Sequence, residues 1–171
     1  MPLTRDVTTS PIVTALVIPD PANAADFVPY LNRRDEVSSS NARRVLCLFG
    51  VEAVPVLAAA LVDADIEARK EGVEVLWTML VGEPAWAVRE TLMRIQPELL
   101  VLLDDKRPLP DHLPEYVERD FEGRICDLTF LVLQQAMNPQ YDQSLFRSFD
   151  DSERDDEIAR LKRRGLGNVV A

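Results

Sequence analysis

The chain has few of the residues that enzymes most often use for catalysis. Only one of its 171 residues is histidine, His112, and only two are cysteines, Cys47 and Cys126. One histidine excludes a metal centre of the usual His and Cys type and any histidine base outside the loop that holds it. We expect His112 to lie in solvent. Both cysteines sit among apolar neighbours, so we expect buried free thiols, with a disulfide or a reactive thiol as the alternative.

Signals for nucleotides and membranes are also missing. The sequence contains no G-x-x-x-x-G-K-[ST] and no G-x-G-x-x-G motif. The apolar run near the start, Ile12–Ile18, contains Thr14 and is followed by Asp20 and Pro21. It is shorter than a secretory signal or a spanning helix of about 20 apolar residues requires. We therefore expect a cytoplasmic protein without a membrane contact.

Basic residues are scarce relative to acidic ones. The chain has 19 Lys and Arg against 29 Asp and Glu, which gives a formal net charge of −10 and an isoelectric point of about 4.6. Such a charge repels phosphate groups and attracts cations at long range. We therefore expect no nucleic-acid partner, and a basic protein as the favoured partner. The alternative is that the surplus of acids only keeps the protein soluble.

No segment combines the alternating pattern, frequent turns and β-branched residues of a sheet protein. The fold class that we expect is all-α, and the length fits one domain. We expect an N-terminal arm over residues 1–24, a helical domain over 25–164 and a tail over 165–171. Within the domain, a repeat part covers about 25–105 and rear helices cover about 114–164.

Apolar residues recur at three- and four-residue steps through most of the domain. This spacing predicts helices around residues 27–31, 42–49, 54–61, 73–80, 84–95, 97–103, 117–133, 145–149 and 152–164. Ser38–Asn41 are expected to cap the second of these helices, and a capping box over Ser152–Asp155 the last. Asp104–Pro114 contains three prolines and is expected to be a loop.

Short sequence patterns recur at a fixed offset. Val28–Leu31 is matched 26 residues later by Val54–Leu57, and Ala42–Arg44 by Ala68–Lys70 at the same offset. Pro97–Leu99 begins a third copy. Recurrence at a fixed period is typical of proteins built from stacked helical hairpins.

Pro55, Asp63, Ala68 and Arg69 have the spacing of a HEAT-like repeat, and the sequence resembles this family, including its shorter form named for phycobilisome lyases. The resemblance covers about residues 26–105. It is partial in the first copy, where Val37 replaces the aspartate, and in the third, where no arginine follows. It implies a short α-solenoid of antiparallel helical hairpins with a concave binding surface. In this family the proline starts a helix, and the aspartate and arginine join the hairpins, so these residues are read as scaffold.

Two groups of acids are candidates for binding a partner. Glu115, Glu118 and Glu122 recur at three- and four-residue steps, opposite the apolar face of the helix expected there. The second group, Asp150, Asp151 and Asp155, belongs to the densest acidic stretch of the chain. Both groups are also compatible with solvated helix surfaces, because acids stabilise a helix start without any partner.

Trp77 and Trp86 lie on the two sides of the turn at residues 82–84. Each is expected either to pack in the core or to anchor an interface, since tryptophan is frequent at the centre of binding surfaces.

These observations favour a non-catalytic protein-binding module that needs no cofactor or metal. One concrete version is a bacterial immunity protein that neutralises a basic toxin, since small acidic cytosolic proteins serve that role. An enzyme or chromophore-handling protein of the bilin lyase type is the alternative from another class, prompted by the resemblance. An assembly scaffold is a third possibility.

Overall fold

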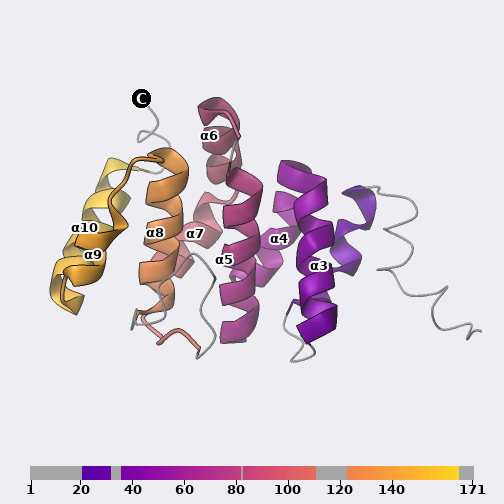
Figure 1. The fold of residues 1–171 in the computed structure, drawn as a ribbon, viewed down its shortest axis with the longest axis horizontal. Coiled ribbons are helices and arrows are strands. Elements are labelled where there is room, and N and C mark those ends of the chain that lie inside the picture. Colours follow the sequence, from indigo (N-terminus) through magenta and orange to yellow (C-terminus); the bar gives the residue numbers. More distant parts are fainter. Residues whose placement is uncertain (1–20, 32–35, 82, 111–122, 166–171) are drawn as a thin grey trace, which may run out of the picture. The chain divides into compact units, whose positions relative to one another are not determined.

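The computed structural model describes residues 21–31, 36–81, 83–110 and 123–165 of the chain (Figure 1). Within these ranges the regular elements are α-helices and 3-10 helices. The described residues form no strand, and Pro108 and Arg124 form one isolated antiparallel bridge. The expectation of an all-α protein is confirmed. The chain divides into two compact units, Met1–Met79 and Leu80–Ala171.

In the first unit, the described residues form short 3-10 helices and three α-helices. Their bounds are η1 Pro21–Asp26, η2 Val28–Tyr30, α3 Glu36–Phe49, η3 Gly50–Ala53, α4 Val54–Leu61 and α5 Ile66–Leu80. Phe27 and Leu31 are buried and pack beside α3, where the rings of Phe27 and Phe49 lie 6.2 Å apart. Gly50 ends α3 with a φ of 58°, a backbone conformation that glycine adopts without strain.

Two local predictions for the first unit are wrong. Residues 21–26 and 28–30 form 3-10 helices, where an α-helix was predicted around residues 27–31. The proline of η2, Pro29, has no amide hydrogen, and i→i+3 bonds close these short turns. Ser38–Asn41 lie inside α3 and do not cap it, because the helix begins at Glu36. There Ser39 donates its hydroxyl to the carbonyl of Leu31 at 3.4 Å.

The predicted hairpin between α4 and α5 is present, with its turn at Asp63–Asp65. Asp63 accepts a hydrogen bond from the amide of Asp65 at 2.8 Å, and Asp65 accepts one from the amide of Glu67 at 2.9 Å. The carboxylate that binds an amide of the first turn of α5 is therefore that of Asp65. The helices approach closely at Gly72, where a Cβ would lie 3.0 Å from Cδ2 of Leu61.

The described residues of the second unit form five α-helices. Their bounds are α6 Ala85–Arg94, α7 Gln96–Leu103, α8 Ile125–Met137, α9 Gln143–Ser148 and α10 Asp151–Arg164. The central helix α8 contacts α6, α7 and α10 and is buried from Ile125 to Leu133. Phe130 of α8 stacks on Phe146 of α9, with ring centroids 4.4 Å apart. This stacked pair places α9 against α8, with α10 following along the chain.

Two predicted helix starts are corrected in this unit. The helix predicted over 117–133 begins at Ile125, because Arg124 has an extended backbone and the Asp127 carboxylate accepts its amide at 3.0 Å. Residues 111–122, which include the first part of the predicted helix, lie outside the described ranges. In α10 the capping box consists of Asp150 and Glu153, two residues earlier than predicted. Gly165, with a φ of 77°, ends α10 as expected.

One stretch of the described residues, Ser39–Leu61, is long and apolar enough to cross a membrane by length and composition alone, with a mean hydropathy of 1.9. The 3-10 helix η3 and the positive φ of Gly50 interrupt it. Buried helices of a protein core meet the same criterion, so this stretch is weak evidence for a membrane contact.

Candidate acidic binding surface

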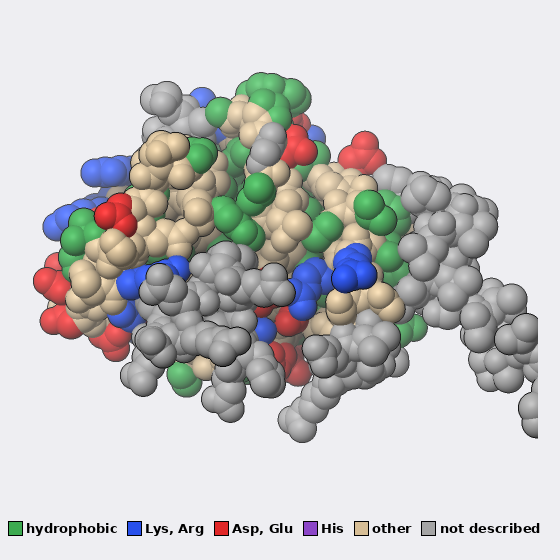
Figure 2. All heavy atoms as spheres, in the orientation of Figure 1, with side chains coloured by type: hydrophobic (Ala, Val, Ile, Leu, Met, Phe, Trp, Pro, Cys, Tyr) green, Lys and Arg blue, Asp and Glu red, His purple; other side chains and the backbone are tan. Residues whose placement is uncertain are grey.

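The densest group of carboxylates in the described part of the chain lies at the start of α10. Six of the eight residues 150–157 are Asp or Glu, and the only basic one is Arg154. Figure 2 shows the acidic side chains at the lower left, over the start of α10, with Lys and Arg side chains above them. The charges of this helix are thus separated along its length. The helix dipole favours acids at the N-terminus and basic residues at the C-terminus, so these charges stabilise both ends of α10.

Arg154 is turned into the protein, and its contact with an exposed acid, Asp151, is a long one of 3.9 Å. Its side chain is 10% exposed, and Nη1 lies 3.6 Å from the carboxylate of Asp127. Its guanidinium lies 6.0 Å from the ring centroid of Phe146, and Nη2 donates to the carbonyl of Arg147 at 3.0 Å. The exposed residues of this half of α10 are therefore Asp150, Asp151, Ser152, Glu153 and Asp156.

Two of the three acids predicted on this stretch are open to solvent. Asp150 is exposed, and its carboxylate accepts the amide of Glu153 at 2.9 Å in the capping box. Asp151 has a side chain that is 73% exposed and lies 3.9 Å from both Arg124 and Arg154. At that distance the two arginines attract Asp151 weakly and leave it accessible to another cation.

The third predicted acid, Asp155, is already bound by two cations of the chain itself. Its Oδ2 accepts a hydrogen bond from Lys106 Nζ at 2.5 Å, and its Oδ1 lies 2.9 Å from Nη2 of Arg124. Partial desolvation by burial acts to raise the pKa of Asp155, but the hydrogen bonds from Lys106 and Arg124 outweigh it and lower the pKa. Asp155 therefore keeps its charge in a pair that the sequence pattern did not reveal.

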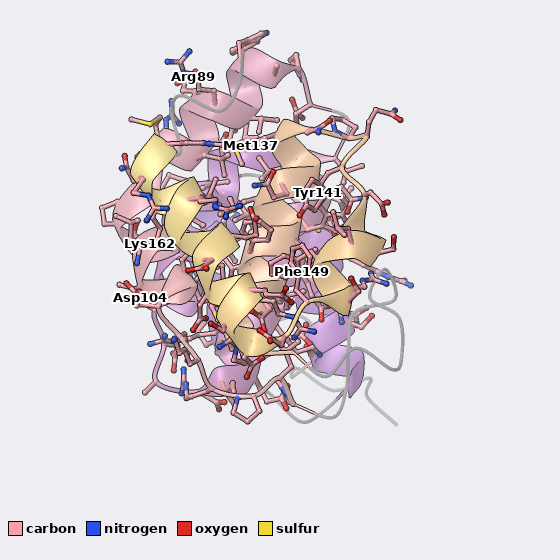
Figure 3. The ribbon with its side chains drawn as sticks, turned by 90° about the vertical axis from the view of Figure 1, so that its left-hand side faces the viewer. Arg89, Asp104, Met137, Tyr141, Phe149 and Lys162 are labelled. Atoms are coloured by element: carbon pink, nitrogen blue, oxygen red, sulfur yellow. The ribbon has the colours of Figure 1, made fainter. Side chains whose placement is uncertain are left out.

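Apolar and aromatic side chains lie on α9 and at its two ends, just before these acids in the chain. Phe149 precedes Asp150 and is half-buried, while Leu145 on α9 is exposed. Tyr141 and Phe149, both labelled in Figure 3, flank the two ends of α9. Burial raises the pKa of Tyr141 to about 12, with a smaller contribution from the charges of Glu157 and Asp142. The surface therefore combines negative charge with exposed apolar groups.

Glu115, Glu118, Glu122 and His112 lie outside the described residues. The backbone on either side of that segment is hydrogen bonded: Leu109 donates its amide to Gly123 at 2.9 Å, and Ile125 donates to Arg107 at 3.0 Å. The flanks 105–109 and 123–126 are thus held together at the base of the segment.

The two tryptophans occupy different environments. Trp86 on α6 is 70% exposed, so of the two alternatives left open for it, packing in the core does not apply. Met93, seven residues later, is also exposed and lies on the same side of the helix. Trp77 is half-buried. Trp86 is therefore accessible to a partner as an interface anchor, whereas Trp77 is less accessible.

A second group of charges is buried between α3 and α5 of the first unit. Arg43 Nη1 lies 2.7 Å from Glu74, Arg43 Nη2 lies 3.3 Å from Glu71, and Lys70 lies 3.4 Å and 3.2 Å from Glu71 and Glu74. Burial raises the pKa of Glu74, the nearby charge of Glu71 raises it further, and Lys70 and Arg43 oppose both effects. The four charges are paired with one another, so we read this group as structural.

The arginine predicted to join the repeats does bind the preceding turn. Arg69 donates its Nε to the carbonyl of Asp63 and its Nη2 to the carbonyl of Val62 at 3.2 Å. Both carbonyls lie at the end of α4, where helix acceptors have no partner within the helix. Arg69 therefore caps its own hairpin, which agrees with a scaffold role for this position.

The described residues do not form a recognisable catalytic arrangement. Cys47 and Cys126 are free, and burial raises the pKa of Cys126 to about 12, which disfavours the reactive thiolate. Burial also raises the pKa of Cys47. No group of three or more His, Cys, Asp or Glu within the described ranges is placed to hold a metal ion.

Comparison of the chain with family models, with curated proteins and with solved structures gives no match.

Proposed function

We propose that this chain is a non-catalytic protein-binding module whose acidic surface at the start of α10 engages a basic protein in the cytoplasm. The observation that carries this proposal is the inward position of Arg154, which leaves only carboxylates and Ser152 exposed over residues 150–157. Phe149 precedes Asp150 in the chain and Leu145 on α9 is exposed, and both add apolar area to the proposed contact. Exposed carboxylates are complementary to a partner that carries lysines and arginines.

We further propose that the frame is a short HEAT-like solenoid. In support, η2, α4 and α7 each have a proline in the first turn, at Pro29, Pro55 and Pro97. Each of these elements is followed by a longer helix, namely α3, α5 and α8. Arg43 on α3 also binds carboxylates on α5, the kind of charged contact that joins neighbouring repeats.

A bacterial immunity protein is the specific version that we favour. It follows from the small size, the net charge of −10 and an exposed acidic surface without a catalytic arrangement beside it. This version predicts that a gene next to that of the chain encodes a basic protein that is toxic when produced alone. Co-production of the chain should restore growth. Continued toxicity, or the absence of any such neighbour, would exclude the immunity role and leave other binding roles open.

Binding of a defined cation tests the surface itself. We expect the purified protein to bind a decalysine peptide in an isothermal titration at low salt, and the affinity to fall as salt is added, because the contacts are between exposed charges. The double variant Asp151→Asn, Asp156→Asn should bind about three- to tenfold more weakly, since each exposed charge contributes up to about 1 kcal/mol. Both positions are exposed and outside the capping box, so the fold should be retained.

The control is a variant with the same change of net charge at another place. Asp26 and Glu52 are exposed acids of the first unit, and Asp26→Asn, Glu52→Gln removes two negative charges there. We expect its affinity for decalysine to fall by less than twofold. Equal weakening by both double variants would mean that the peptide senses only the net charge, and the proposed surface would then be wrong.

A further inference from the structure

Lys106 occupies the same carboxylate that a basic partner would use. Its ammonium group donates to Oδ2 of Asp155, while Oδ1 of Asp155 faces Arg124. Lys106 is thus a cation from another segment, 49 residues away in sequence, placed on the acidic surface of α10. Asp155 presents the geometry of an occupied binding position, with an internal lysine in place of an external one.

The two cations that hold Asp155 differ in how firmly they are fixed. The side chain of Arg124 is 12% exposed, and its Nε and Nη2 donate to the two oxygens of the buried Asp127 at 3.0 and 2.9 Å. The side chain of Lys106 is 61% exposed, and within the described ranges its ion pair is with Asp155. An exposed lysine pair is weak and solvent-screened, whereas a bidentate arginine pair is held by its fixed geometry. Lys106 can therefore leave Asp155 at little cost, and Arg124 cannot.

We propose that Lys106 is an autoinhibitory contact, an internal mimic of the partner's lysine that a basic partner displaces from Asp155. This inference rests on the proposed function and adds its regulation. Displacement exchanges one lysine–carboxylate pair for another, so the contact lowers affinity slightly without preventing binding. It also selects against weakly basic partners, because a single cation gains little by replacing Lys106, whereas several cations arranged along α10 bind Asp150, Asp151 and Asp156 as well.

The test compares the affinity of decalysine for the wild type and for Lys106→Gln. We expect the variant to bind about two- to fivefold more tightly, because Asp155 is then open to the peptide. Lys106→Arg keeps the internal cation and should bind like the wild type. Arg163→Gln, at the exposed C-terminal end of α10, removes one positive charge at a distance from Asp155. Its increase in affinity should be less than half of the increase for Lys106→Gln.

Removal of Asp155 completes the test. In a protein that already carries Asp155→Asn, Lys106→Gln should increase the affinity for decalysine no more than Arg163→Gln does, because the carboxylate of residue 155 is absent. If decalysine binds the wild type but Lys106→Gln and Arg163→Gln give equal gains, the autoinhibitory contact is refuted and the proposed function stands. If decalysine binds neither the wild type nor Lys106→Gln, both the proposed function and the contact are refuted.

Discussion

Two buried charge groups among the described residues differ in how their carboxylates are hydrogen bonded. In the second unit, the Asp127 side chain is 0% exposed and receives two hydrogen bonds from the Arg124 guanidinium and one from the Arg124 amide. In the first unit, Glu74 is also buried and faces Arg43 and Lys70, yet its Oε1 accepts no hydrogen bond from the described residues although Lys70 lies 3.2 Å away. The number of charges is similar, but the hydrogen bonding is not.

This difference decides which carboxylate supports the fold. A buried ion stabilises a structure only when hydrogen bonds replace the water that it has lost. Asp127 meets this condition, and it also fixes the start of α8. Glu74 meets it in part, and burial accordingly raises its pKa. We therefore expect the charge of Asp127 to be required for stability and the charge of Glu74 to be dispensable.

The largest effect is expected from Asp127→Asn. The change preserves the shape of the side chain but leaves Arg124 and Arg154 without their buried counter-ion, which costs about 3–5 kcal/mol. Urea unfolding followed by circular dichroism measures this loss. Asp151→Asn is the control, because Asp151 faces the same two arginines from the surface. A similar loss for both variants would show that the burial of Asp127 is unimportant.

A smaller loss is expected from Arg43→Gln. The change removes the cation whose Nη1 lies 2.7 Å from Glu74, and the free energy of unfolding should fall by about 1–2 kcal/mol, because Arg43 is partly exposed and water replaces some of its contacts. Its exposed neighbour in the sequence offers a matched control, Arg44→Gln, which should change stability by less than about 0.5 kcal/mol. If the two variants cannot be distinguished by urea unfolding, the buried group of the first unit contributes nothing through Arg43.

The smallest effect is expected from Glu74→Gln, and its sign depends on pH. Because the pKa of Glu74 is raised in the folded protein, the folded state binds a proton there more tightly than the unfolded chain does. The ionised carboxylate therefore destabilises the fold increasingly as the pH rises from the ordinary glutamate pKa through the raised one.

At pH 7, Glu74→Gln should equal or exceed the wild type in stability by up to about 1 kcal/mol. The advantage should disappear near pH 4, where Glu74 is protonated and resembles glutamine. Unfolding curves at several pH values measure the difference between the two proteins. If Glu74→Gln is clearly less stable than the wild type at pH 7, this account is contradicted. The charge of Glu74 would then be required for stability, as is expected for Asp127.

The sequence predicted the helices better than their ends. Apolar spacing located α4, α7 and α10 to within about two residues, because one buried face repeats regularly in each. It failed at residues 21–31, where the run is too short to separate an α-helix from 3-10 turns. It also failed at the start of α8, because the extended conformation of Arg124 depends on Asp127 and on pairing with the chain near Pro108.

The proposed binding surface was visible in the sequence only in part. The density of acids from Asp150 onward was visible in the sequence, and so was the helix that carries them. The occupation of Asp155 by Lys106 was not, since the two residues are 49 positions apart and only the tertiary fold brings them together. The sequence left the position of Trp86 open between core and surface for a related reason. Its spacing with Val88 and Leu92 fits an inner face, and helix periodicity alone does not fix how wide that face is.

The most direct test of the proposed surface is a chemical-shift titration of the isotopically labelled protein with decalysine. The account predicts that the amides of residues 150–157, together with those of Leu145 and Phe149, shift progressively and saturate together, and that the shifts are lost on adding salt. Saturable shifts confined to other helices, with residues 150–157 unchanged, would contradict it.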